Sequence, residues 1–183
     1  MKTRKNLLKI SEHIKSGILI LLLLFLFSCR NYSEKKEPVS RRSREEMTDI
    51  NRYMVTKDRE RIESYIERKE LKMEESPTGL WFKINKEGEG ANFTDGDRIL
   101  FSYTCSLLDG TLCYNSEELG PKEIVLGKST LEAGLNEGFR MLRPGADAVF
   151  ILPPFMAFGL IGDGKKIPSR AILVYNVTIL PAR

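Results

Sequence analysis

Hydrophobic residues first gather at 17–27, where eleven apolar residues follow one another without interruption. The residues before this run are polar and basic, and Ser28, Cys29 and a strongly polar stretch follow it. A helix that crosses a bilayer needs about 20 apolar residues, so the run is too short to span one. The order of basic region, short apolar core and small residue is typical of a secretory signal peptide. We therefore expect residues 1–28 to be a signal peptide, with an uncleaved signal anchor as the alternative.

The stretch at 29–45 has no cluster of aliphatic residues. It is highly charged and contains Pro38. Such a segment cannot bury enough apolar surface to fold alone. We expect it to be a flexible tether.

Helical periodicity begins at Glu46, and neither glycine nor proline occurs from there to Lys72. Thr56 is placed where its hydroxyl could cap the start of a second helix. We therefore expect a helical arm over 46–75, made of one broken or two short amphipathic helices. Its narrow apolar stripe could pack on its own domain or on a second copy of the chain, giving a homodimer. The stripe consists of Met47, Ile50, Met54, Val55, Ile62 and Ile66.

The period changes to two after the turn residues of Ser76–Gly79, which marks a domain boundary. One segment, 129–142, instead carries apolar residues at helical spacing. We expect 76–183 to be an α+β domain in which an antiparallel half-barrel wraps over one short helix. The expected strands are 80–84, 98–108, 111–115, 123–126, 147–152 and 171–180.

Asp109 and Gly110 predict a two-residue hairpin turn in which both residues need a positive φ. That turn places Cys105 opposite Tyr114 and puts Cys113 on the other face of the sheet. A disulfide would be possible in an oxidising compartment. A bulge would alter the register, so the pairing stays open, and free thiols are favoured.

The net charge of +4 comes from the leader. Residues 1–28 hold five basic residues and one acidic residue, which leaves 24 of each in the rest of the chain. A neutral mature protein gives no electrostatic sign of nucleic-acid binding. The single histidine, His13, also lies in the leader. Cleavage would therefore exclude histidine-dependent nucleophilic catalysis and remove a common metal ligand, so we expect no metal and no cofactor.

The end of the leader, Leu26 to Cys29, resembles a lipobox. The resemblance implies that signal peptidase II cuts before Cys29 and that Cys29 carries lipid.

Short motifs across the C-terminal domain occur in an order and spacing that resemble the FKBP family of prolyl isomerases. The resemblance implies the FKBP fold and prolyl cis-trans isomerase activity. The motifs are Tyr103-Thr104, Leu108-Asp109-Gly110-Thr111, Leu126-Gly127-Lys128, Gly134, Glu137-Gly138, Met141 with Gly145, Pro153-Pro154, Ala157-Phe158-Gly159, Ile167-Pro168 and Leu173 to Val177.

The resemblance also implies an apolar, uncharged pocket with Tyr103, Phe158 and Tyr175 as its catalytic residues. The implied substrate-binding residues are Tyr114, Asn115, Ile124, Leu131, Glu132, Leu135 and Ile167. Four positions depart from the family pattern, which predicts reduced activity. Phe158 replaces a tyrosine, Leu135 an aromatic residue that is often tryptophan, Asn115 an aspartate, and Glu132 an apolar residue.

These features lead to the hypothesis of an isomerase that acts on proline-containing clients and assists the folding of exported envelope proteins. Lipid on Cys29 would hold it in the cell envelope, at the outer membrane facing the periplasm. The combination is similar to the gliding-motility-associated FKBP-type lipoproteins of Bacteroidetes. The alternatives are a catalytically weak FKBP-like binding module or chaperone, and a structural lipoprotein that keeps only the fold.

Replacing Cys29 with serine should block lipid attachment and signal-peptide removal, because serine has no thiol to carry the lipid. Labelling cells with a radioactive fatty acid measures the attachment. The same change at Cys113 should leave labelling intact. A Cys29→Ser protein that is still labelled would contradict the lipobox assignment.

Overall fold

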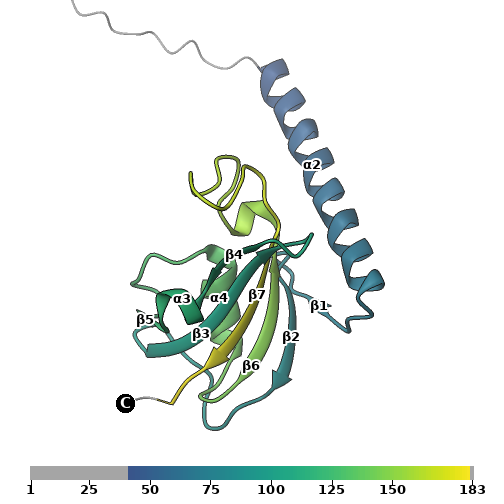
Figure 1. The fold of residues 1–183 in the computed structure, drawn as a ribbon. Helices are drawn as coiled ribbons and strands as arrows, with labels where there is room; N and C mark the ends of the chain where they lie inside the picture. Colours follow the sequence, from purple (N-terminus) through teal and green to yellow (C-terminus); the bar gives the residue numbers. More distant parts are fainter. Residues whose placement is uncertain (1–40, 182–183) are drawn as a thin grey trace, which may run out of the picture. The chain divides into compact units, whose positions relative to one another are not determined.

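The computed structural model describes residues 41–181. The expected signal peptide, Cys29 and most of the expected tether lie outside them. The expected α+β class is confirmed: the domain is one antiparallel sheet of seven strands with a short helix on one face (Figure 1). The strand order is β1-β2-β6-β7-β3-β4, and β5 also pairs with β3.

The strands lie close to where the alternation of apolar residues predicts them. A short first strand and two short helical turns, α3 and η1, were not predicted. The elements after helix α2 (Arg41–Arg68) are β1 (Glu74–Glu75), β2 (Trp81–Lys86), β3 (Arg98–Leu107), β4 (Leu112–Asn115), α3 (Ser116–Leu119), β5 (Lys122–Val125), α4 (Ala133–Met141), β6 (Asp147–Leu152), η1 (Pro154–Met156) and β7 (Leu173–Ile179).

Helix α4 lies against β6, and two glycines allow the close approach. A Cβ on Gly138 would stand 2.7 Å from the Phe150 ring, and one on Gly134 would stand 2.5 Å from Leu152. Contacts this short leave no room for a larger residue. The helix thereby covers the main core, which includes Phe101, Leu135, Phe139, Phe150 and Leu173.

The turn between β3 and β4 differs from the predicted two-residue hairpin. The N–H of Gly110 donates to the carbonyl of Leu107 at 2.9 Å, and Gly110 alone adopts a positive φ, at 91°. Asp109 therefore keeps an ordinary backbone, and the glycine closes the loop as it does after a type I turn.

A bulge follows from this turn and decides where the two cysteines lie. Cys105 pairs with Tyr114 as predicted, but Ser106 pairs with Leu112, so Cys113 is the extra residue. The prediction that the two cysteines lie on opposite faces is wrong, because the bulge returns Cys113 to the core cluster that holds Cys105. Both thiols are free.

Helix α2 (Arg41–Arg68) is one unbroken helix, so the prediction of a break near Thr56 is wrong. The Thr56 hydroxyl donates to the carbonyl of Arg52 at 3.0 Å. This is the bond to the preceding turn that threonine makes inside a helix, so Thr56 caps nothing. The helix also begins at Arg41, inside the range expected to be a tether.

The helix ends at Arg68, before the expected end of the arm at residue 75. The N–H of Leu71 donates to the carbonyl of Ile66, and the N–H of Glu70 to that of Glu67, both at 3.0 Å. Glu70 has a φ of 51°. These bonds form a Schellman end, with glutamate in the place usually taken by glycine.

The C-terminal half of α2 packs on the face of the sheet opposite α4. Ile62, at 1% exposure, forms a second core cluster with Ile151, Ile172 and Val174. Ile151 and Val174 reach this face because they alternate with Phe150 and Tyr175, which face α4. Within 41–181, no helix is long and apolar enough to cross a membrane.

Replacing Ile62 with alanine should lower the free energy of unfolding by about 2–5 kcal/mol, because it opens a cavity between α2 and the sheet. Urea unfolding followed by circular dichroism measures the change. Ile50→Ala is the matched control, since Ile50 lies on the same helix at 60% exposure and should cost little. Equal losses of unfolding free energy in the two variants would show that the contact between α2 and the sheet does not stabilise the fold.

Candidate functional site

A cavity of about 350 Å³ opens on the α4 side of the sheet. Strands, both short helices α3 and α4, and the loop between η1 and β7 all contribute to its wall. The lining residues are Phe101, Tyr103, Tyr114, Leu119, Lys122, Glu132, Leu135, Phe158, Asp163, Lys165 and Tyr175.

Aromatic rings from the neighbouring strands β3 and β7 form the floor of the cavity. The Phe101 and Tyr103 rings lie 5.7 Å apart, and the Tyr103 and Tyr175 rings lie 6.2 Å apart. Both distances suit favourable aromatic pairs. Phe101 and Tyr103 share a face because they stand two residues apart on β3. Leu135 closes the floor from the first turn of α4.

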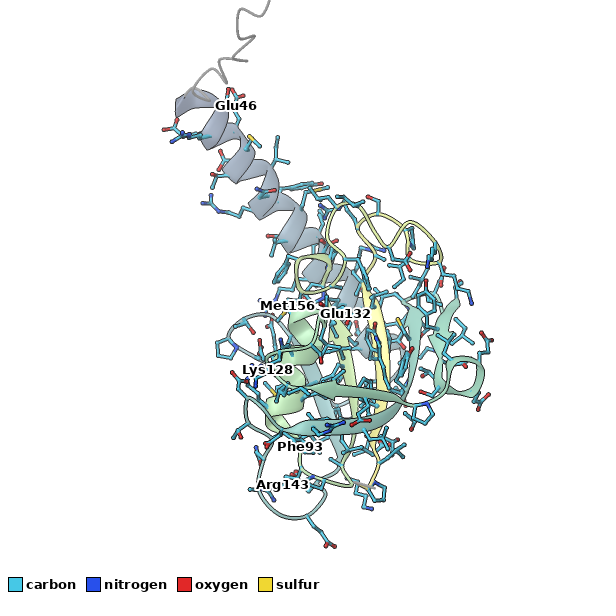
Figure 2. All side chains as sticks on the ribbon, turned by 90° about the vertical axis from the view of Figure 1, so that its left-hand side faces the viewer. Glu46, Phe93, Lys128, Glu132, Arg143 and Met156 are labelled. Carbon is cyan, nitrogen blue, oxygen red and sulfur yellow. The ribbon has the colours of Figure 1, made fainter. Side chains whose placement is uncertain are left out.

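Tyr175 and Glu132 join the sheet to the start of the helix. The Tyr175 hydroxyl donates to Glu132 Oε1 at 2.9 Å. Glu132, labelled in Figure 2, immediately precedes α4. Burial, and then the nearby Glu132 carboxylate, raises the pKa of Tyr175 far above its usual range. The hydroxyl therefore stays protonated at all physiological pH values.

Asp163 organises the loop that forms the opposite wall. Its Oδ1 accepts from the N–H groups of Lys165 and Ile167, each at 2.8 Å. Its Oδ2 accepts from the Tyr114 hydroxyl on β4. One carboxylate thus holds the loop in shape and ties it to the sheet.

The same contacts shift the pKa values of both groups. Burial by itself raises the pKa of Asp163, but the hydrogen bonds from Tyr114, Ile167 and Lys165 outweigh it, and the pKa lies below its usual range. The hydrogen bond to Asp163 raises the pKa of Tyr114. The aspartate therefore stays ionised and the tyrosine stays neutral.

The cysteine beside the cavity is unsuited to covalent chemistry. Cys105 pairs with Tyr175 across β3 and β7. Burial raises the pKa of the Cys105 thiol to about 12. The thiolate is the nucleophile, so Cys105 is inert at neutral pH.

Residues 90–180 match the family model described as FKBP-type peptidyl-prolyl cis-trans isomerase. Every residue that lines the cavity falls within this stretch. These residues form a domain of the FKBP family.

Two curated relatives show similarity over the FKBP domain. The probable FKBP-type peptidyl-prolyl cis-trans isomerase FkpA of Neisseria meningitidis serogroup B is 33% identical over 103 residues, which cover 56% of this chain and 38% of that protein. Human peptidyl-prolyl cis-trans isomerase FKBP9 is 35% identical over 86 residues, which cover 46% of this chain and 15% of that protein. The chain thus spans well under half the length of these relatives.

Solved structures show the same fold. The N-terminal domain of FKBP42 from Arabidopsis thaliana matches with a TM-score of 0.55 and 26% identity, over 59% of this chain and 89% of that one. FkpA from Escherichia coli matches with a TM-score of 0.58 and 22% identity, over 97% of this chain and 88% of that one.

Six of the ten residues predicted for the pocket of the FKBP domain line the cavity. The three predicted as catalytic are among them. The six are Tyr103, Tyr114, Glu132, Leu135, Phe158 and Tyr175.

The other four predicted residues do not line the cavity. Ile124 and Ile167 are buried in the main core, and Leu131 packs against it. Asn115 caps α3, where its side-chain oxygen accepts from the N–H of Glu118 at 2.7 Å. Asn115, which stands where the family pattern has aspartate, therefore caps a helix and does not form part of the cavity wall.

Five lining residues were not predicted, and three of them carry charge. Phe101 could have been found from its spacing to Tyr103. Lys122 could have been found from its spacing to Ile124 on β5. Asp163 has only a turn-like sequence context, so no pattern marks its role. The five are Phe101, Leu119, Lys122, Asp163 and Lys165.

The prediction of an uncharged pocket is therefore wrong. Lys122, Glu132, Asp163 and Lys165 all line the cavity. The two carboxylates accept hydrogen bonds from Tyr175 and Tyr114. Charge is thus present at the wall, although the floor is aromatic.

Replacing Asp163 with asparagine should change how stability depends on pH. The pKa of Asp163 is lower in the folded protein, so its stabilising effect is complete above the unfolded value of about 3.9 and is lost as the pH falls through the folded value. At pH about 7 the variant should have a lower melting temperature than the wild type, and this difference in melting temperature should shrink towards pH about 2. Thermal unfolding across this range measures the difference.

Glu89→Gln is the control for this measurement, because Glu89 is an exposed loop carboxylate. A constant difference in melting temperature between wild type and Asp163→Asn at every pH would contradict the assignment.

Proposed function

We propose that the FKBP domain catalyses cis-trans isomerisation of the peptide bond before proline in polypeptide substrates. The observation that carries the proposal is the aromatic cavity of Phe101, Tyr103, Phe158 and Tyr175 inside the segment that matches the family model. Its volume of about 350 Å³ suits a proline ring with part of its neighbours.

The chemistry requires no nucleophile. Isomerisation twists a partial double bond over a barrier of about 18–20 kcal/mol. The twisted amide has lost resonance and is less polar. The apolar floor of the cavity therefore favours it over the planar ground state. The inert Cys105 thiol and the neutral tyrosines are compatible with this mechanism.

A backbone donor is available at the wall. Within the part of the chain that the structure describes, the N–H of Glu132 has no hydrogen-bond partner, as is usual at the start of a helix. A substrate carbonyl could accept from it. Replacement of the family's apolar residue by Glu132 leaves this backbone group unchanged.

The departures at Phe158 and Leu135 support reduced activity. Phe158 keeps an aromatic ring at the wall but has no hydroxyl to donate, and Leu135 offers less surface than an aromatic residue. These two residues also support a second candidate, a binding module or chaperone that holds proline-containing segments without accelerating their isomerisation.

We infer the cellular setting from the sequence of the leader alone. Signal cleavage before Cys29 and lipid on its thiol would anchor the domain in the cell envelope, with exported proteins as clients. Orientation towards the periplasm at the outer membrane, and a link to gliding-motility lipoproteins, stay predictions. A homodimer through α2 is supported by the exposed apolar side chains of Met47, Ile50, Tyr53 and Val55.

Replacing Phe158 with tyrosine should raise kcat several-fold, because it adds a donor at the cavity wall. A neutral hydrogen bond contributes about 0.5–1.5 kcal/mol, so the gain should not exceed about tenfold. Tyr175→Ala should lower kcat much more, since it exposes the floor of the cavity to water. A protease-coupled assay on one proline peptide measures all three proteins.

Phe155→Tyr is the matched control, because Phe155 is exposed on η1 and does not line the cavity. It should leave the rate unchanged. Absence of activity in every protein would favour the binding module. An unchanged rate in Phe158→Tyr would show that Phe158 is not at a donor position.

A further inference from the structure

The loop that carries Phe158, Asp163 and Lys165 to the cavity is closed at its far end by Arg170. The N–H of Arg170 donates to the carbonyl of Gly159 at 3.0 Å, which brings the two ends of the loop together. Arg170 has a φ of 56°, a conformation uncommon for a residue with a side chain. Contacts of Arg170 with other residues therefore help to hold this conformation.

The guanidinium of Arg170 meets a buried carboxylate on α2. Its Nη2 donates to Asp58 Oδ2 at 2.7 Å, across 112 positions of sequence. The Asp58 side chain is 6% exposed and that of Arg170 is 27% exposed. Arg61 lies 3.6 Å from the other carboxylate oxygen of Asp58.

Asp58 is the only buried charged residue in the part of the chain whose burial is described. A buried carboxylate without a partner is strongly unfavourable. Arg170 is the closer of its two cationic neighbours and the one that donates a hydrogen bond to it. The Asp58 carboxylate therefore favours the position of Arg170 seen here, and with it the position of the end of the cavity loop.

We propose that Asp58 is a positioning residue for the cavity, which makes the helical arm a part of the substrate-binding unit. Through Arg170 it holds the loop in the conformation that places Phe158 and Asp163 in the cavity wall. The inference rests on the proposed isomerase function for its effect on turnover, but the effect on the loop can be measured separately.

A second ion pair between α2 and the domain provides a matched control. Arg59, the next residue on the helix, contacts Glu75 on β1. Glu75 is remote from the cavity loop in the sheet order, because β1 pairs with β2 alone. Loss of this pair should loosen α2 without releasing Arg170.

The test compares Asp58→Ala, Arg170→Ala and their double variant with Arg59→Ala in the full chain. Losing a pre-organised loop reduces the fraction of protein ready to bind, so KM for a proline peptide should rise about three- to tenfold while kcat changes less than about twofold. The double variant should be no worse than the worse single variant, because both remove one interaction. Arg59→Ala should leave KM unchanged.

Amide hydrogen exchange of residues 159–170 gives the independent readout. It should accelerate in Asp58→Ala and Arg170→Ala and stay at the wild-type rate in Arg59→Ala. If Asp58→Ala does not fold, Asp58→Asn keeps the shape of the side chain and takes its place. All measurements belong well below the melting temperature of the least stable variant.

Two results would overturn the proposal. One is unchanged KM and loop exchange in the Asp58 variants, which would make the ion pair purely structural. The other is the same change in Arg59→Ala, which would trace the effect to general docking of α2. A wild type that is inactive on proline peptides would refute the proposed isomerase instead, and loop exchange would then decide the role of Asp58 alone.

Discussion

The register between β3 and β7 determines most of what the domain can do. Seven consecutive pairs join the strands, from Phe101 opposite Ile179 to Leu107 opposite Leu173. A slip of one residue would exchange the two faces of the sheet. In the observed register, Tyr103 and Tyr175 face α4 and form the floor of the cavity. Val174 faces the other way and meets α2.

The face opposite α4 shows how one register serves two purposes. Where α2 covers it, the strand residues that face the helix are aliphatic and buried, as at Ile151 and Val174. Beyond the helix they are polar and bond across the strands. Asn176 donates to Thr104 at 3.0 Å, and Thr178 donates to Asp147 at 2.8 Å. The composition of this face therefore records how far the helix reaches.

Sequence reasoning recovered what depends on local periodicity. Alternation located the main strands, and helical spacing located α4 and most of α2. The resemblance to a family added Tyr103, Phe158 and Tyr175, which share no periodic pattern.

The features that the sequence did not predict depend on contacts between distant segments. The role of Asp163 exists only because β4 brings Tyr114 to it, and the bulge at Cys113 results from a turn one residue longer than the simplest hairpin. Thr56 illustrates a different difficulty, since one hydroxyl can cap a helix or bond within it.

The tyrosines of the cavity and Asp163 each keep one protonation state near neutral pH. The tyrosines have pKa values raised by burial or by a carboxylate partner, and that of Asp163 is lowered by its donors. A site that works by shape and polarity gains from this arrangement, because these groups keep the same charge as the pH varies around neutrality.

The bulge at Cys113 has a consequence for how the folded domain responds to its redox surroundings. It leaves two reduced sulfurs in the core, at 0% exposure for Cys105 and 1% for Cys113, each with a pKa raised by burial. Oxidants and glutathione reach such thiols only when the native structure opens. In the folded domain, neither an oxidising nor a reducing surrounding therefore changes the state of these two thiols.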